Sequence, residues 1–238
     1  MFSSRLPKDI SPSPFFAELE RVKTCAKKDA AEGGLSFIDM TVSSPVKVGL
    51  PIDLNAAVDE GRESFGCWNP DAAGWMSARE AVVEYYRERG GNFTAGQIIL
   101  TASTSEAYSV LFKTFCDPGD VILTPMPGYP LLDTLAQLEH LECAPYFLQL
   151  RRENARKLAT DERREGAAFR FVLDTDSLLA APERAKILLL VSPHNPTGHC
   201  ISREEWNAAV RFCEENGMVL VVDEVVGDYA FSDKVKRT

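Results

Sequence analysis

From residue 97 onward, short apolar runs alternate with amphipathic segments. The apolar runs have strand length and predict strands at 97–101, 121–124, 143–150, 186–191 and 218–222. The segments between them carry apolar residues at helical spacing and predict helices at 105–116, 131–139 and 202–216. This alternation favours an α/β fold, in which helices cover both faces of a mostly parallel sheet.

Local signals mark several element ends. Ser202 is the expected N-cap of the last helix, Glu205 completes a capping box with it, and Gly217 ends the helix. Further upstream, the pattern predicts helices at 54–65 and 78–86, and an irregular arm over residues 1–50 with one amphipathic stretch at 15–27. The charged segment 151–166 is predicted to be a solvated loop.

Composition excludes several classes of protein. A chain of 238 residues with 45% hydrophobic and 26% charged residues can bury a substantial core. The net charge of −9 gives no basic surface for nucleic acid, so we expect no nucleic-acid partner. The six cysteines form no CxxC pair and the three histidines have no metal-ligand spacing, so we expect no metal. Without a signal peptide or a long apolar span, we expect a cytoplasmic protein without a membrane partner.

Two polar side chains follow neighbouring predicted strands. Asn195 lies in the turn SPHNPTG after strand 186–191, and Asp223 ends strand 218–222. Parallel strands end at one edge of a sheet, so both side chains would face one crevice. Asn195 could instead serve only the turn, whereas a carboxylate ending a buried strand needs a partner. We expect His194 to be a neighbour of this turn and His199 to be an exposed loop residue, and we assign neither a role.

A third candidate is an anion site. Ser103, Thr104 and Ser105 lie between a predicted strand and the amino end of a helix, where backbone N–H groups and hydroxyls attract a phosphate. The alternative is that Ser103 or Thr104 only caps the helix. No GxGxxG or GxxxxGK[ST] loop follows a predicted strand, so nucleotide binding is disfavoured.

Five segments occur in the order of one family: DMTVSSPVKVGLP, GCWNPDAAGWMSAREAVVEYYRERG, TASTSEAYSVLFKTFCDPGDVILTPMPGYP, SPHNPTG and VVDEVV. With them the chain resembles the fold-type I pyridoxal-phosphate (PLP) enzymes, in particular the aminotransferase class I/II family. The resemblance implies PLP, with its phosphate on residues 103–105, its phenolic oxygen at Asn195 and its ring nitrogen at Asp223. It also implies that Tyr129 stacks on the ring, although a tyrosine in such a turn can be only a packing residue. Gly49 would lie near the substrate carboxylate.

The same resemblance implies an activity and an organisation. We expect a homodimeric enzyme of amino acid metabolism that moves an amino group between an amino acid and a 2-oxo acid. Residues 1–53 would form the arm and part of a small domain, and residues 54–238 a PLP-binding large domain. Two alternatives stay open: another fold-type I enzyme, such as a carbon–sulfur lyase or a carboxy-lyase, or an inactive remnant that binds PLP or serves as a structural partner.

The chain also departs from the family pattern. The family's Schiff-base lysine lies some tens of residues beyond the aspartate, whereas this sequence ends fifteen residues after Asp223, with only Lys234 and Lys236 in between. We therefore expect a fragment that lacks the catalytic lysine and contains no catalytic residue. Val226 replaces a tyrosine that donates to the phenolic oxygen, and Tyr229 is the nearest substitute. Trp68 replaces a tyrosine that reaches the neighbouring subunit's phosphate.

Overall fold

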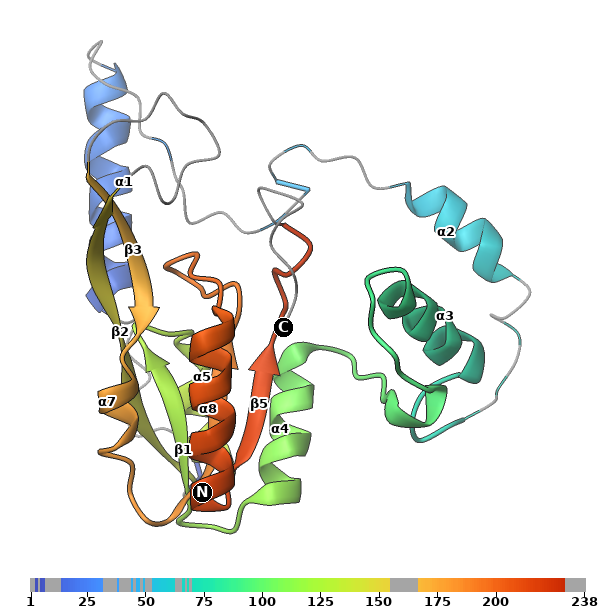
Figure 1. Cartoon of the computed structure of the whole chain (residues 1–238). Coiled ribbons are helices and arrows are strands. Elements are labelled where there is room, and N and C mark those ends of the chain that lie inside the picture. Colours follow the sequence, from blue (N-terminus) through green and yellow to red (C-terminus); the bar gives the residue numbers. More distant parts are fainter. Residues whose placement is uncertain are drawn as a thin grey trace. The chain divides into compact units, whose positions relative to one another are not determined.

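The fold is described from a computed structural model of the chain. It describes residues 3, 5–6, 14–31, 38, 44, 46–47, 49, 53–62, 66, 68, 70–154 and 167–229. The chain divides into two compact units, residues 9–100 and residues 1–8 with 101–238 (Figure 1). The second, larger unit contains the sheet and the candidate site.

The described part of the larger unit contains a five-stranded sheet with the order β3-β2-β1-β4-β5. The strands are β1 (Val121–Met126), β2 (Glu142–Asn154), β3 (Ala167–Leu173), β4 (Ala185–Val191) and β5 (Val219–Asp223). β2, β1, β4 and β5 are parallel neighbours, and β3 joins β2 in the antiparallel sense. The sheet is therefore mostly parallel, which confirms the predicted α/β class.

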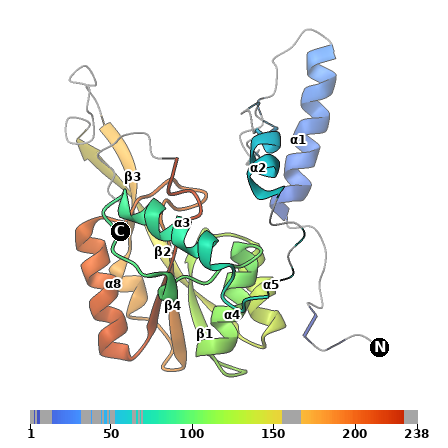
Figure 2. The ribbon, with the colours of Figure 1, turned by 90° about the vertical axis from the view of Figure 1, so that its right-hand side faces the viewer.

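Helices cover both faces of this sheet (Figure 2). They are α4 (Thr104–Phe115), α5 (Leu131–Leu138), α7 (Thr175–Leu178) and α8 (Arg203–Asn216). Because successive strand residues point to opposite faces, β4 contributes side chains to two hydrophobic clusters, one on each face of the sheet. Leu188 and Leu190 pack with α7 and α8, and Ile187 and Leu189 pack with α4 and α5. All four are at most 1% exposed, and each such side chain stabilises the fold by about 1.5–3 kcal/mol.

The predicted ends of α8 are confirmed. The Ser202 hydroxyl accepts from Glu205 N, and the Glu205 carboxylate accepts from Ser202 N, which is the capping box. Gly217 ends the helix with φ of +63°, a left-handed conformation that glycine adopts without steric strain. These contacts fix where α8 begins and ends between β4 and β5.

The regular elements described in the smaller unit are all helices. It contains α1 (Pro14–Ala31), α2 (Leu54–Gly61), α3 (Met76–Arg87) and the short 3-10 helix η2 (Ala95–Gln97). The buried Arg79 donates to the carbonyls of Gly74 and Ala95 and pairs with Asp71 at 2.9 Å. This arginine ties the segment before α3 to the segment after it. None of the helices in the described ranges combines the length and apolar character needed to cross a bilayer.

Two predictions of secondary structure were wrong. Residues 97–101 do not form a strand, because Gln97 completes a capping box with Thr94 and the Leu100 N–H donates to Ala73 O. The segment 151–166 is not all loop, because β2 continues to Asn154 and pairs with β3; residues 155–166 lie outside the described residues. Charged residues occupy successive positions at the end of β2, where Arg151 lies opposite Arg170 of β3, so the alternating apolar pattern of a strand is missing there.

Candidate functional site

The predicted site residues that follow strands share one edge of the sheet. β1, β4 and β5 are adjacent and parallel, so their carboxyl ends lie together. Val191 at the end of β4 is in register with Asp223 at the end of β5, and Ser192 N donates to Asp223 O at 2.9 Å. The amino end of α4 lies at the same edge (Figure 1). The fold therefore brings the loops after β1 and β4 close to Asp223.

Asp223 is half-buried and has two donors. Its Oδ2 accepts from the Tyr108 hydroxyl on α4, and its Oδ1 accepts from Val225 N at 2.8 Å. Tyr108 is only 3% exposed, and burial, together with the bond to Asp223, raises the pKa of its hydroxyl. The phenol therefore stays neutral and donates. Tyr108 was missed in the sequence because it occupies an apolar position of an amphipathic helix.

The predicted anion loop surrounds the beginning of α4. Ser103 is the N-cap, and its hydroxyl accepts from Glu106 N at 3.2 Å. The helix begins at Thr104, so the N–H groups of Thr104 and Ser105 have no acceptor one turn earlier. Glu106 Oε2 accepts from Ala102 N at 2.5 Å and so engages one donor of this loop. The cap predicted as an alternative role for Ser103 is present, and a cap leaves the next N–H groups available to an anion.

Tyr129 and Asn195 are exposed at this edge. Tyr129 follows β1 and is 43% exposed. After burial and the bond to Asp223, electrostatic interaction with Tyr129 makes a smaller contribution to the raised pKa of Tyr108. Asn195 lies in the turn after β4, which His194 N closes by donating to His199 O at 2.7 Å.

The other residues carried over from the resemblance belong to the smaller unit, to the turn after β5 or to the part of the chain that is not described. Gly49, with φ of +83°, and Trp68, which is 91% exposed, belong to the smaller unit. Val226 lies in the turn after β5, and Tyr229, which is 61% exposed, donates its N–H to Val226 O. Lys234 and Lys236 lie outside the described residues. The roles predicted for these residues stay predictions.

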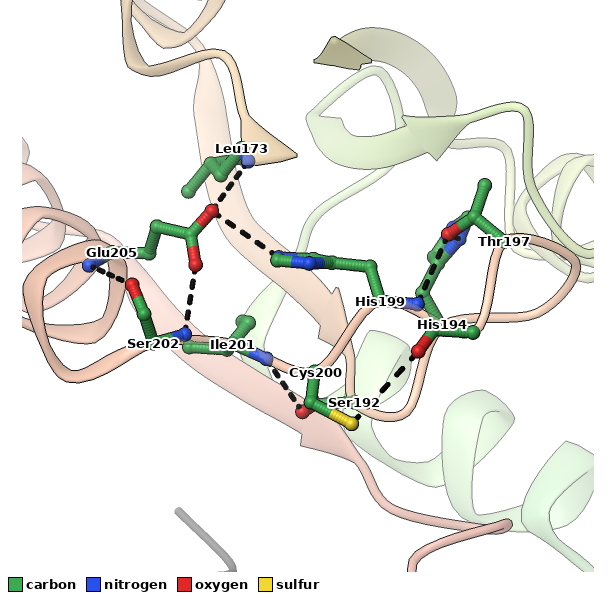
Figure 3. Close-up of polar contacts among 10 residues, drawn as sticks. Leu173, Ser192, His194, Thr197, His199, Cys200, Ile201, Ser202 and Glu205 are labelled. Carbon is green, nitrogen blue, oxygen red and sulfur yellow. Dashed lines mark hydrogen bonds and ion pairs between the residues drawn. The ribbon is translucent and has the colours of Figure 1, made fainter. Parts of the chain in front are cut away.

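A buried polar cluster adjoins the turn that contains Asn195; Figure 3 shows His199 of this turn beside Glu205 of α8. Glu205 Oε1 accepts from Leu173 N at 2.6 Å. The same oxygen lies 3.2 Å from His199 Nε2, which is within ion-pair distance, although this contact does not have hydrogen-bond geometry. Burial alone would raise the pKa of Glu205, but its contact with His199 and the N–H groups of Ser202 and Leu173 lower it to about 2. The prediction that His199 is exposed was wrong, since it is 8% exposed.

His194 adds a second buried imidazole to this turn. It is 2% exposed, and its Nδ1 lies 2.8 Å from Thr197 Oγ1. Burial, with a smaller contribution from His199, lowers the pKa of His194 to about 4. His194 is therefore neutral near pH 7, and it belongs to the interior of the turn that presents Asn195.

Comparison with known proteins identifies related sequences. A model of the family described as aminotransferase class I and II matches residues 69–237. Tyrosine aminotransferase from Bos taurus is 28% identical over 206 residues, which cover 83% of this chain and 42% of the relative. LL-diaminopimelate aminotransferase from Gloeobacter violaceus is 28% identical over 234 residues, which cover 94% of this chain and 53% of the relative. The chain thus spans about half the length of these relatives or less.

Solved structures share the fold. An alanine aminotransferase from Pyrococcus furiosus superposes with a TM-score of 0.68 at 22% identity, covering 94% of this chain and 52% of that one. The N-succinyldiaminopimelate aminotransferase from Mycobacterium tuberculosis gives a TM-score of 0.64 at 22% identity, covering 94% and 52%. At this identity the likeness shows the fold and carries no information on substrate.

Proposed function

Because the chain belongs to the aminotransferase class I and II family, we propose that the shared edge of β1, β4 and β5 binds PLP, on which members of this family depend. The observation that carries the proposal is the half-buried carboxylate of Asp223, which ends β5 beside the amino end of α4. A carboxylate and a helix amino end suit the two charged ends of this cofactor, its protonated ring nitrogen and its phosphate.

Each residue of the edge has a role in this proposal. Ser103, Thr104 and Ser105 bind the phosphate through backbone N–H groups and hydroxyls. Tyr129 stacks on the ring and excludes water from one face, and Asn195 donates to the phenolic oxygen. Asp223 accepts from the ring nitrogen and keeps its proton in place. Bound there, PLP supplies an electron sink for chemistry at an amino acid.

The residues at this edge, apart from Glu106, fit the cofactor. The carboxylate of Asp223 can accept about four hydrogen bonds, so it can serve the ring nitrogen in addition to Tyr108 and Val225. Ser103 and Thr104 are exposed at the helix end, and the Ser103 hydroxyl, which accepts from Glu106 N, can still donate to an anion. Glu106 does not fit an anion site, because its carboxylate is itself an anion and accepts from Ala102 N. It must turn away from Ala102 before a phosphate can bind to this loop.

For the whole protein we propose amino-group transfer between an amino acid and a 2-oxo acid. The relatives named tyrosine and LL-diaminopimelate aminotransferase support this reaction, as does the match to the family model. We also propose a homodimer, a cytoplasmic location and a substrate carboxylate near Gly49. These proposals rest on the family resemblance.

Titration of the chain with PLP tests the proposed site. We expect saturable binding that survives gel filtration, and an affinity at least about tenfold weaker for pyridoxal, because pyridoxal lacks the phosphate that the amino end of α4 binds. Fluorescence quenching and absorbance measure both ligands. Treatment with borohydride shows in addition whether a lysine of the chain is linked to the cofactor. Equal affinity for the two ligands, or no binding of PLP, would contradict the proposal.

Replacement of Tyr129 tests the stacking role. We expect Tyr129→Ala to weaken PLP binding about 3- to 10-fold, because an aromatic stack contributes about 0.5–1.5 kcal/mol. Its thermal stability should change little, since the side chain is 43% exposed. Phe169→Ala on β3 is a matched control, because Phe169 is also an exposed aromatic residue, at 62%. A loss of PLP affinity that is equal in both variants would exclude the stack.

A further inference from the structure

We propose that Tyr108 is a positioning residue of the cofactor site, which holds the Asp223 carboxylate in the orientation that meets the ring nitrogen of PLP. This inference rests on the proposed PLP site and adds to it a residue on α4. It starts from one contact: the Tyr108 hydroxyl donates to Asp223 Oδ2.

Asp223 needs such support because of its place in the fold. It is the last residue of β5, and β5 is the outermost strand of the sheet in the described part of the chain. An aspartate side chain has two rotatable bonds, and a half-exposed one at a strand end samples several rotamers. With Tyr108 on Oδ2 and Val225 N–H on Oδ1, both oxygens are fixed. The remaining lone pairs then point in a defined direction.

Tyr108 is itself well fixed. It is 3% exposed and stacks on Phe112, one turn along α4, with ring centroids 6.0 Å apart and planes inclined by 22°. Its ring packs in the core cluster that also contains Ile187 and Leu189 of β4. The packed core therefore fixes the Tyr108 hydroxyl, and the hydroxyl in turn fixes Asp223. If the carboxylate turned away, the buried hydroxyl would have no acceptor, which costs free energy.

The position of Tyr108 in α4 connects the two ends of the site. Tyr108 comes four residues after Thr104, so it lies one turn below the first helical N–H groups and on the same side of the helix. One rigid helix thus carries the proposed phosphate site at its amino end and the donor to Asp223 one turn later. The distance between the phosphate-binding and nitrogen-binding groups is set by α4.

Tyr108→Phe tests this role, with Tyr146→Phe as the matched control. Both tyrosines are buried, at 3% and 2%, and each hydroxyl has one protein acceptor, since Tyr146 donates to Leu189 O at 2.9 Å. We expect Tyr108→Phe to weaken PLP binding about tenfold, because a hydrogen bond to a charged group is lost. We also expect it to move the ¹⁵N resonance of the ring nitrogen of bound [¹⁵N]PLP. Tyr146→Phe should change neither, although both variants lose stability.

A second comparison separates positioning from mere packing. If Tyr108 acts through Asp223, Tyr108→Phe has no further effect on PLP affinity in an Asp223→Asn background, so the two effects are not additive. Additive effects, or a Tyr108→Phe variant that matches Tyr146→Phe in affinity and ¹⁵N resonance, would overturn the inference and leave the PLP site standing. Failure of the wild-type chain to bind PLP would overturn both.

Discussion

Replacing Asp223 with asparagine is expected to weaken PLP binding about 10- to 100-fold. The substitution keeps the shape of the side chain and an oxygen that can accept from Tyr108, but it removes the negative charge. A charge-assisted hydrogen bond is about twice as strong as a neutral one and contributes about 1.5–3 kcal/mol. The site is half-buried, so water screens this interaction only in part. Fluorescence titration with PLP measures the loss.

Glu214→Gln provides the control for this change. Glu214 is an exposed residue near the end of α8, and its substitution removes the same charge from the same unit of the protein. Because α8 begins after the β4 turn and runs 14 residues back along the sheet, Glu214 lies near the opposite edge from Asp223. We expect wild-type affinity in this variant. If Asp223→Asn also binds PLP like the wild type, the cofactor does not use this carboxylate.

The parallel core of the fold could be predicted because its pattern has few alternatives. From Ile187 to Val191 the strand is apolar on both faces, and the predicted range 186–191 agrees with β4 to within one residue. β3 could not be found in the same way, because its apolar run 171–173 is short and follows a charged segment, and the neighbouring Phe169 and Arg170 are both exposed. Strand 97–101 failed for the opposite reason. Its apolar residues include Ile99, which is 67% exposed, so the hydrophobic run does not mark a core.

The part of the candidate site that follows from the order of the strands could be predicted. Asn195 and Asp223 share an edge because β4 and β5 are parallel neighbours, which follows from the alternating elements. Tyr108 could not be predicted, since a tyrosine at an apolar helical position satisfies the pattern through its ring and gives no sign of its hydroxyl's partner. Glu205 was recognised as a capping-box residue, which accounts for only one carboxylate oxygen. Its second oxygen accepts from the backbone N–H of Leu173, which is distant in sequence and on another element, β3.

The contacts of both carboxylate oxygens of Glu205 predict a large effect of its substitution on stability. We expect Glu205→Gln to lower the free energy of unfolding by about 2–3 kcal/mol at pH 7, because the charged carboxylate accepts from two backbone N–H groups and lies beside His199. The glutamine can accept through one oxygen only, so its amide nitrogen faces a buried backbone donor. Urea unfolding followed by tryptophan fluorescence, to which Trp206 on the same helix contributes, measures the difference.

The same contact predicts a pH dependence with a definite sign. The pKa of Glu205 falls from its ordinary 4.5 to about 2 in the folded chain, so its contribution is fully present above pH 4.5 and is lost as the pH falls through about 2. The difference in stability between wild type and Glu205→Gln should therefore shrink between pH 4.5 and 2. Glu204→Gln is the control, since Glu204 lies in the same first turn but is exposed, and it should unfold like the wild type. A difference that is unchanged at low pH would mean that Glu205 stabilises the fold through its shape and not through its charge.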